Sequence, residues 1–339
     1  MRAFFASRPD LSPTPTRQLD ALAGELGLGA VLAKDESTRF GLNAFKLLGA
    51  RFTLDRLLAA GRLRPGATLA CASEGNHGRA VARAARDAGC AARVYMAADA
   101  AQARVEAIAA EGAEVVRIAG SYDDAVRLVE QHAQAHGWTV ISDTAWEGYE
   151  EIPRLIMLGY TRMMEEVEDR YDAVFVQGGV GGLLCGVASW CARHRDPRPS
   201  IVCVEPAQAA CLLTSARAGR PVAVKGPLET TMAGLRNREV SPLAFRAVQP
   251  IVDAYLGIDD HWAHQAMRRL GRPAGGDPVI AAGASGAAAL GGLLAVMHDP
   301  ALTPVRTRLA LGPSARVLVV VSEGVTDPAL WARIVGPPN

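Results

Sequence analysis

Residues 67–89, ATLACASEGNHGRAVARAARDAG, decide the fold class. The apolar run ATLACAS (67–73) predicts a short buried strand, and the spacing of apolar residues over 77–89 predicts a helix. Between them lies EGNHG (74–78), whose glycines are typical of a turn. A strand, a turn and a helix in this order form the repeating unit of an α/β fold with a parallel sheet.

Strands and helices in this order form two series along the chain. The first series continues with predicted strands at 92–98, 113–120 and 138–143 and predicted helices at 101–112 and 121–137, the latter capped by Ser121 and Gly137. A long helix predicted over 150–170 opens the second series, which has predicted strands at 171–179, 200–206 and 316–324. Two such series predict two three-layer α/β domains with mostly parallel sheets.

Composition excludes several classes of protein. The chain has 339 residues, of which 50% are hydrophobic, and a net charge of +1, whereas a nucleic-acid binder normally carries a basic stripe. No apolar run approaches the roughly 18 residues of a membrane helix, and MRAFFASRPD at the start lacks the pattern of a secretory signal. A cytoplasmic protein is therefore expected. The six cysteines lack metal-ligand spacing, so we predict no metal site and interpret them as small buried side chains.

Glycines follow two of the predicted strands. Asn76 lies in EGNHG, and Gly178 to Gly182 form GGVGG before a predicted helix. Ligands of open α/β sheets bind beyond the carboxyl ends of the strands, and amides at a helix N-terminus bind phosphate. GGVGG matches neither the nucleoside-triphosphatase loop nor the dinucleotide fingerprint. It is interpreted as an anion site, with a tight packing turn as the alternative.

Polar side chains end two further strands. Asp143 follows 138–142 and Ser322 follows 316–321. Either side chain could bind a ligand at the mouth of its strand. The alternatives are a helix N-cap at Asp143 and a simple turn at Ser322.

Lys46 is one of only three lysines and lies in RFGLNAFKLLGA (39–50). No carboxylate occurs three or four positions away, so we expect an unpaired amine in an apolar setting, where burial lowers its pKa. Such an amine condenses readily with an aldehyde. A lysine, a phosphate-binding loop and polar groups at strand ends together predict pyridoxal phosphate as cofactor.

Long motifs connect the chain to a known family. KDESTRFGLNAFK (34–46) and DTAWEGY (143–149), together with EGNHG, QGGVGG and VSEG, resemble the fold-type II pyridoxal-phosphate enzymes, and within them the diaminopropionate ammonia-lyases. The resemblance implies Lys46 as the covalent anchor and Asp143 and Glu74 as catalytic carboxylates for opposite enantiomers. The implied cofactor-binding residues are Lys46, Asn76, Gly178, Gly179, Val180, Gly181, Gly182 and Ser322.

The resemblance also implies an architecture and an activity. Residues 1–48 plus 150–339 would form a large cofactor-binding domain and 49–149 a small domain, with the cofactor in the cleft between them. The implied reaction is α,β-elimination from a small amino acid, 2,3-diaminopropionate foremost, to pyruvate and ammonia, in a homodimer. A serine or threonine dehydratase, a β-replacement synthase and a non-catalytic cofactor-binding protein are the alternatives.

Two residues depart from the family pattern. Glu74 stands where the family has an aspartate, and Ala284 stands where it has a glutamate. One added methylene displaces a carboxylate by about an ångström, which is enough to alter the substrate or the enantiomer used. These departures bear on the substrate more than on the type of chemistry.

Overall fold

The computed structural model describes residues 4–5, 8, 11–73, 75–98 and 100–336. The chain divides into two compact units. Unit 1 comprises Met1–Leu11 and Lys46–Tyr160, and unit 2 comprises Ser12–Phe45 and Thr161–Asn339. The division into cofactor-binding domains at residues 48/49 and 149/150 stays a prediction, because compactness alone does not define a cofactor-binding domain.

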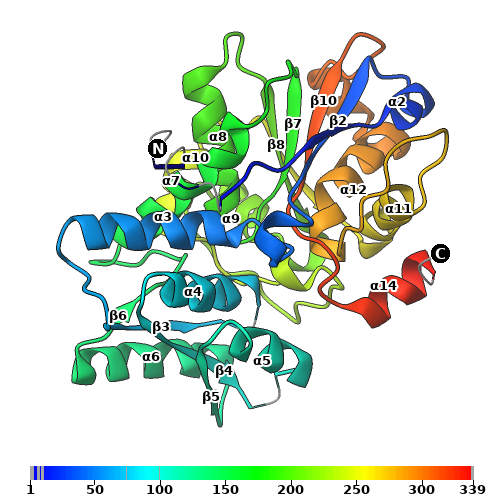
Figure 1. The fold of residues 1–339 in the computed structure, drawn as a ribbon. Coiled ribbons are helices and arrows are strands. Elements are labelled where there is room, and N and C mark those ends of the chain that lie inside the picture. Colours follow the sequence, from blue (N-terminus) through cyan, green and yellow to red (C-terminus); the bar gives the residue numbers. More distant parts are fainter. Residues whose placement is uncertain (1–3, 6–7, 9–10, 74, 99, 337–339) are drawn as a thin grey trace. The chain divides into compact units, whose positions relative to one another are not determined.

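Unit 1 is built on a four-stranded parallel sheet (Figure 1). The strand order is β5-β4-β3-β6, with β3 at Thr68–Ala72, β4 at Ala91–Ala97, β5 at Glu114–Ile118 and β6 at Thr139–Val140. Its helices are α3 (Lys46–Ala59), α4 (Asn76–Asp87), α5 (Gln102–Ala109), α6 (Tyr122–His136) and part of α7 (Glu151–Glu165). Helices α4 and α6 cover opposite faces of the sheet, which confirms the predicted layers.

The caps of α6 are those predicted from the sequence. The Ser121 side chain accepts a hydrogen bond from the Asp124 amide in a capping box, and Gly137 ends the helix with a φ of 67°. Strand β6, by contrast, is shorter than the predicted 138–143. The Ile141 amide still donates to the Ala70 carbonyl of β3, but side chains bind the Val140 and Ile141 carbonyls and the Ser142 amide, as described below.

Unit 2 is built on a six-stranded sheet of order β1-β2-β10-β7-β8-β9. The strands are β1 (Thr16–Gln18), β2 (Ala30–Asp35), β7 (Ala173–Gln177), β8 (Ser200–Pro206), β9 (Ala254–Ile258) and β10 (Arg316–Val321). Only the β1–β2 pair is antiparallel. The mostly parallel sheet confirms the predicted fold class, and the apolar run of β10 is typical of a strand buried on both faces.

Helices complete unit 2. They are α2 (Asp20–Leu26), α8 (Gly182–His194), α9 (Cys211–Ala218), α10 (Pro242–Val248), α11 (Asp260–Gly271), α12 (Ala284–His298), α13 (Thr303–Arg308) and α14 (Pro328–Val335). Helix α12 is buried from Ala284 to Met297, which fits its being apolar on all sides. Gly286 lets it approach β10, since a Cβ there would lie 2.0 Å from the Glu323 carbonyl oxygen.

The register of unit 2 brings several strand ends to one edge. Val321 pairs with Asp35 in β2, and Gln177 pairs with Val204 in β8. The predicted helix over 150–170 ends earlier, at Glu165, and the side chain of Glu166, which follows it, joins a buried ion cluster. Among the described residues, no helix has the length and apolarity needed to cross a membrane.

Candidate functional site

Lys46 is paired with a carboxylate in unit 1. It is the first residue of α3, and its Nζ lies 2.6 Å from Asp143 Oδ2. The prediction of an unpaired lysine is therefore wrong. The two residues are 97 positions apart, so the pairing has no trace at helical spacing. The two side chains remain 22% and 18% exposed, which leaves both reachable by a small molecule.

The ion pair moves both pKa values in the direction that keeps the charges. Burial lowers the pKa of Lys46, but the negative charge of Asp143 outweighs it, and the pKa lies above its ordinary value. Burial raises the pKa of Asp143, but Lys46 and then His77 bring it below its ordinary range. The expected lowering of the Lys46 pKa is thus corrected, because the decisive neighbour is Asp143.

Tyr160 is a member of this cluster that the sequence did not single out. Its side chain is fully buried, and Lys46 Nζ lies 5.8 Å from its ring centroid. Gly49 permits this approach, because a Cβ on it would lie 2.6 Å from Tyr160 Cε1. Burial raises the pKa of Tyr160, so its hydroxyl stays protonated beside Lys46. The glycine one turn after Lys46 was the only local signal.

The turn after β3 supplies His77 and Asn76. Asn76 is the first residue of α4 and is half-buried, and His77 beside it is buried. His77 Nδ1 lies 3.8 Å from Asp143 Oδ2, and its Nε2 lies 2.8 Å from the Ile141 carbonyl oxygen. Asp143 caps no helix, since α7 begins only at Glu151, so the N-cap alternative is excluded. Glu74 lies outside the described residues.

The glycine loop of unit 2 has the backbone of an anion cradle. Gly178 follows β7, and Gly181 is the N-cap of α8 without a side-chain hydrogen bond. Gly179 and Gly181 have φ values of 58° and 99°, which favour glycine. The amides of the first helical turn have no acceptor within a helix, so those after Gly181 can bind an anion.

Glu205 packs against the backbone of this loop. A Cβ on Gly178 would lie 2.7 Å from Glu205 Cγ, so only glycine fits between them. The Glu205 carboxylate accepts hydrogen bonds from the amides of Leu212 (2.9 Å) and Leu213 (2.8 Å). The Cys211 thiol donates to the Gly179 carbonyl over 3.3 Å. Burial raises the pKa of Glu205 to about 7. Sequence patterns did not reveal this residue.

Ser322 lies at the same sheet edge as the glycine loop and is buried. Its carbonyl accepts a hydrogen bond from the Phe45 amide over 3.4 Å, and the Gly324 amide donates to the Asn43 carbonyl over 2.8 Å. The segment that leads to Lys46 is thus joined to the end of β10. The structure therefore brings Ser322 and Gly178–Gly182 to one edge of unit 2, and Lys46 and Asp143 together in unit 1.

These residues fit pyridoxal phosphate. The free amides before α8 suit a phosphate. The loop needs glycine at Gly178, because any side chain there would collide with Glu205. An aldehyde suits the primary amine of Lys46, because 22% of this side chain is exposed and the amine can form an imine once it has lost its proton. Ser322 can offer its hydroxyl to the pyridine nitrogen, and Asn76 its amide to the ring hydroxyl.

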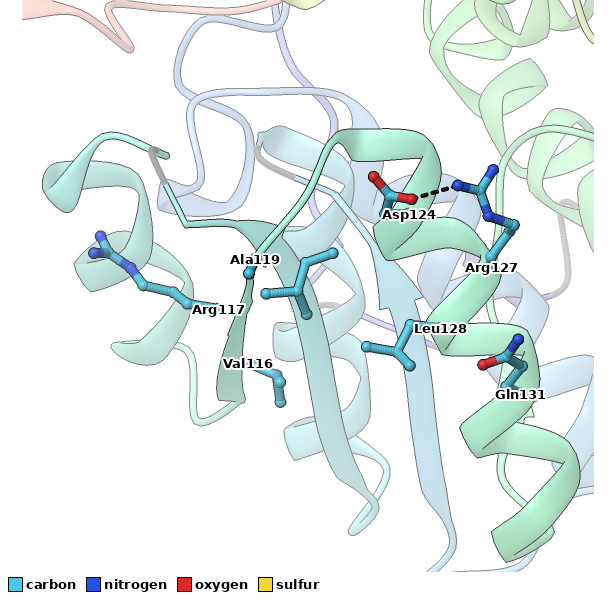
Figure 2. Close-up of a pocket in the computed structure, with 8 residues that line it drawn as sticks. Val116, Arg117, Ala119, Asp124, Arg127, Leu128 and Gln131 are labelled. Atoms are coloured by element: carbon cyan, nitrogen blue, oxygen red, sulfur yellow. Dashed lines mark hydrogen bonds and ion pairs between the residues drawn. The ribbon is translucent and has the colours of Figure 1, made fainter.

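A separate cavity of about 510 Å³ lies between the edge strand β5 and helix α6 (Figure 2). Val116 and Leu128 line it, and Asp124 and Arg127 form an ion pair at its rim. It contains none of the predicted site residues. With no lysine and no catalytic pair along its walls, this cavity differs in chemistry from the Lys46 site.

Comparison with known proteins identifies the family of the chain. The family described as pyridoxal-phosphate dependent enzyme matches residues 8–323. Diaminopropionate ammonia-lyase of Escherichia coli K12 is 39% identical over 98% of this chain and 90% of its own, and that of Salmonella typhimurium is 36% identical over the same shares.

Solved structures give the same result. The crystal structure of holo diaminopropionate ammonia-lyase from Escherichia coli superposes with a TM-score of 0.91 at 38% identity, covering 98% of this chain and 90% of that one. The similarity thus spans both units. The chain belongs to the family of pyridoxal-phosphate dependent enzymes.

Proposed function

We propose that this protein eliminates ammonia from 2,3-diaminopropionate, yielding pyruvate and two ammonia with the uptake of one water. The contact that carries the proposal is the 2.6 Å pair between Lys46 and Asp143. It places a proton acceptor next to the only accessible amine of the described cluster. The 39% identity with an enzyme of that name supports the choice of substrate.

Seven residues and Lys46 would hold the cofactor. Lys46 would bind its aldehyde carbon, the glycine loop its phosphate, Ser322 its ring nitrogen and Asn76 its ring hydroxyl. The loop residues concerned are Gly178, Gly179, Val180, Gly181 and Gly182. When bound, pyridoxal phosphate supplies an electron sink that acidifies the Cα proton of an amino acid.

Asp143 is the base in this proposal. Its pKa lies below the ordinary range, so the carboxylate is ionised at neutral pH and can accept the Cα proton of one enantiomer. The same negative charge attracts the second, cationic amine of diaminopropionate, which leaves as ammonia with the electron pair of its C–N bond. Glu74 would serve the opposite enantiomer.

Product stoichiometry tests the proposal. Purified protein loaded with pyridoxal phosphate is incubated with D- or L-2,3-diaminopropionate, and pyruvate and ammonia are measured. The expected result is two ammonia per pyruvate, with Asp143→Asn losing one enantiomer and Glu74→Gln the other. One ammonia per 2-oxo acid, formed from serine or threonine only, would identify a dehydratase. No 2-oxo acid from any of these amino acids would refute the elimination.

We also propose a homodimer in the cytoplasm, as the resemblance to the family implies. Light scattering of the cofactor-loaded protein gives the mass, with twice 35.7 kDa as the expected value. A monomeric mass at micromolar concentration would contradict the dimer. Fractionation of the producing cells, with the activity followed, tests the compartment.

A further inference from the structure

Two side chains hold the backbone that carries Asp143. Strand β6 ends at Val140. The Tyr149 hydroxyl donates to the Val140 carbonyl over 2.8 Å and accepts from the Ser142 amide over 2.9 Å. Both backbone groups would otherwise lack a ladder partner at this short strand. Tyr149 therefore fixes the peptide groups on either side of Ile141.

His77 holds the carbonyl between those two contacts. Its Nε2 lies 2.8 Å from the Ile141 oxygen, and a carbonyl oxygen only accepts, so Nε2 carries the hydrogen. The other nitrogen, Nδ1, is then directed at the carboxylate, 3.8 Å from Asp143 Oδ2. Nδ1 is buried and has no hydrogen-bond partner among the described residues. A buried polar atom of this kind indicates a function beyond packing.

A rigid turn supports Tyr149. The Trp146 and Tyr149 rings stack with centroids 4.0 Å apart, and the two backbones form an antiparallel bridge. The Tyr149 ring is thus held from its face while its hydroxyl reaches the strand end. The motif DTAWEGY (143–149) therefore contains both Asp143 and the aromatic residues that fix the backbone next to it.

The other groups around Asp143 narrow the role of His77. Lys46, Tyr160, Tyr149 and Cys71 also interact with its charge. Burial raises the pKa of both tyrosines and of the Cys71 thiol, so these three stay neutral. In the proposed function the Lys46 amine is committed to the cofactor. His77 is then the remaining group of this set whose interaction lowers the pKa of Asp143.

We propose that His77 and Tyr149 are positioning residues for Asp143. Tyr149 fixes the backbone at residues 140–142, and His77 fixes the Ile141 carbonyl while its Nδ1 faces the Asp143 carboxylate. The inference rests on the proposed function of Asp143 as a base. A displacement of about 1 Å at such a base costs on the order of 10²-fold in rate.

The test uses the cofactor-loaded enzyme and two variants. His77→Gln keeps an amide donor near the position of Nε2 but removes Nδ1, and Tyr149→Phe removes only the hydroxyl. For the enantiomer that depends on Asp143, kcat is expected to fall about 10²-fold in His77→Gln and about 10-fold in Tyr149→Phe. KM and cofactor absorbance should stay unchanged, and in His77→Gln the acid limb of the kcat profile should move to higher pH.

Matched controls are available in unit 2. His298→Gln alters an exposed histidine at the end of α12, and Tyr255→Phe removes a hydroxyl that has no hydrogen-bond partner among the described residues. Both should leave kcat and its pH profile unchanged. Wild-type kcat at all pH values in His77→Gln, or in Tyr149→Phe, would overturn the inference, since each contact would then be dispensable.

A second measurement separates this inference from the proposed function. In the cofactor-free protein, the His77 ring resonance, identified by its absence in His77→Gln, should move in Asp143→Asn. An unmoved resonance would refute the contact with Nδ1. If diaminopropionate yields no pyruvate but the resonance moves, the proposed function fails while the positioning of Asp143 stands.

Discussion

Lys34 and Lys46 are both within 2.7 Å of a carboxylate, yet their surroundings differ. Lys34 lies in unit 2, is fully buried, and donates to Glu166 (2.7 Å) and to the Thr14 carbonyl (2.6 Å). Lys46 lies in unit 1 beside Asp143, with 22% of its side chain exposed. Lys34 is therefore enclosed by protein acceptors, whereas Lys46 keeps a path to an incoming molecule.

The pKa shifts of the two amines have opposite signs. Burial lowers the pKa of Lys34, and although Glu36 and Glu166 oppose this, the pKa stays below its ordinary value. Arg39 and Arg162 also pair with Glu166, at 2.5 and 3.2 Å, so three cations share this carboxylate. Asp143 raises the pKa of Lys46 above the ordinary value. A short ion pair alone therefore does not identify a reactive lysine. The exposure of the side chain and the number of competing charges distinguish the two lysines.

Removing the Lys46 amine is expected to give the largest effect on activity. Lys46→Ala should lower turnover by about 10⁴-fold or more, because both the covalent anchor and a partner of Asp143 are lost. The visible absorbance of the lysine-bound cofactor should disappear. Lys225→Ala, at an exposed lysine, is the matched control and should behave as wild type. Retained absorbance in Lys46→Ala would mean that another amine anchors the cofactor.

Asp143→Asn should reduce kcat for one enantiomer by about 10³-fold, the usual range for a lost general base. The variant also sharpens the contrast with Lys34. With the carboxylate gone and burial unchanged, the pKa of Lys46 should fall, so that more of the amine is neutral and nucleophilic at pH 7 to 8. Cofactor uptake by the cofactor-free variant should therefore be faster than in wild type at that pH. Slower uptake throughout would show that Asp143 assists the lysine instead of suppressing it.

Lys34→Met should affect stability instead of activity. The Lys34 cluster, formed by Lys34, Arg39, Glu36 and Glu166, is joined by Arg162 at 3.2 Å from Glu166. Losing Lys34 therefore removes one of three cations, together with the hydrogen bonds that it donates to the Thr14 carbonyl and to one Glu166 oxygen. The expected cost is about 3–5 kcal/mol in the free energy of unfolding, measured in urea. Turnover per folded molecule and cofactor absorbance should match wild type. A variant that is fully stable but inactive would reverse the roles assigned to the two lysines.

Local pattern was enough for much of the fold. Strand β8 occupies the predicted 200–206, and Ser121 and Gly137 cap α6 as their chemistry requires. The glycine loop and Ser322 were placed correctly because strand ends of a parallel sheet share one edge. Strand β6 and helix α7 are shorter than predicted; at the end of β6 the Tyr149 hydroxyl binds the Val140 carbonyl and the Ser142 amide in place of a neighbouring strand.

The electrostatics of the site could not be read from periodicity. Asp143 reaches Lys46 across 97 residues, and Tyr160 approaches it only because Gly49 leaves room. Helical spacing concerns only neighbours three and four positions away, so it predicted an unpaired lysine. Because Asp143 was not counted as a partner, the pKa of Lys46 was predicted to fall, whereas it rises. Long-range charge pairs need the tertiary structure, whereas strand ends need only the order of elements.

Glu205 is a third buried ionisable residue, and its substitution should have the smallest effect of those predicted. Unlike the two lysines, it has no ion-pair partner among the described residues; its carboxylate accepts from the backbone amides of Leu212 and Leu213. Burial raises its pKa from 4.5 to about 7, so the native state binds this proton more tightly than the unfolded chain does. The resulting stability is fully present below pH 4.5 and is lost as the pH rises through 7.

Glu205→Gln cannot titrate, so the pair of proteins isolates this contribution. The free energy of unfolding of wild type, relative to the variant, should fall by at most about 3 kcal/mol between pH 4.5 and 7. Urea unfolding of the cofactor-free proteins at several pH values measures it. Parallel pH curves would show that Glu205 ionises as easily in the native state as in water. In that case the backbone amides of Leu212 and Leu213 would be sufficient to stabilise the ionised carboxylate of Glu205. Burial of a charge in this chain would then not require an ion pair.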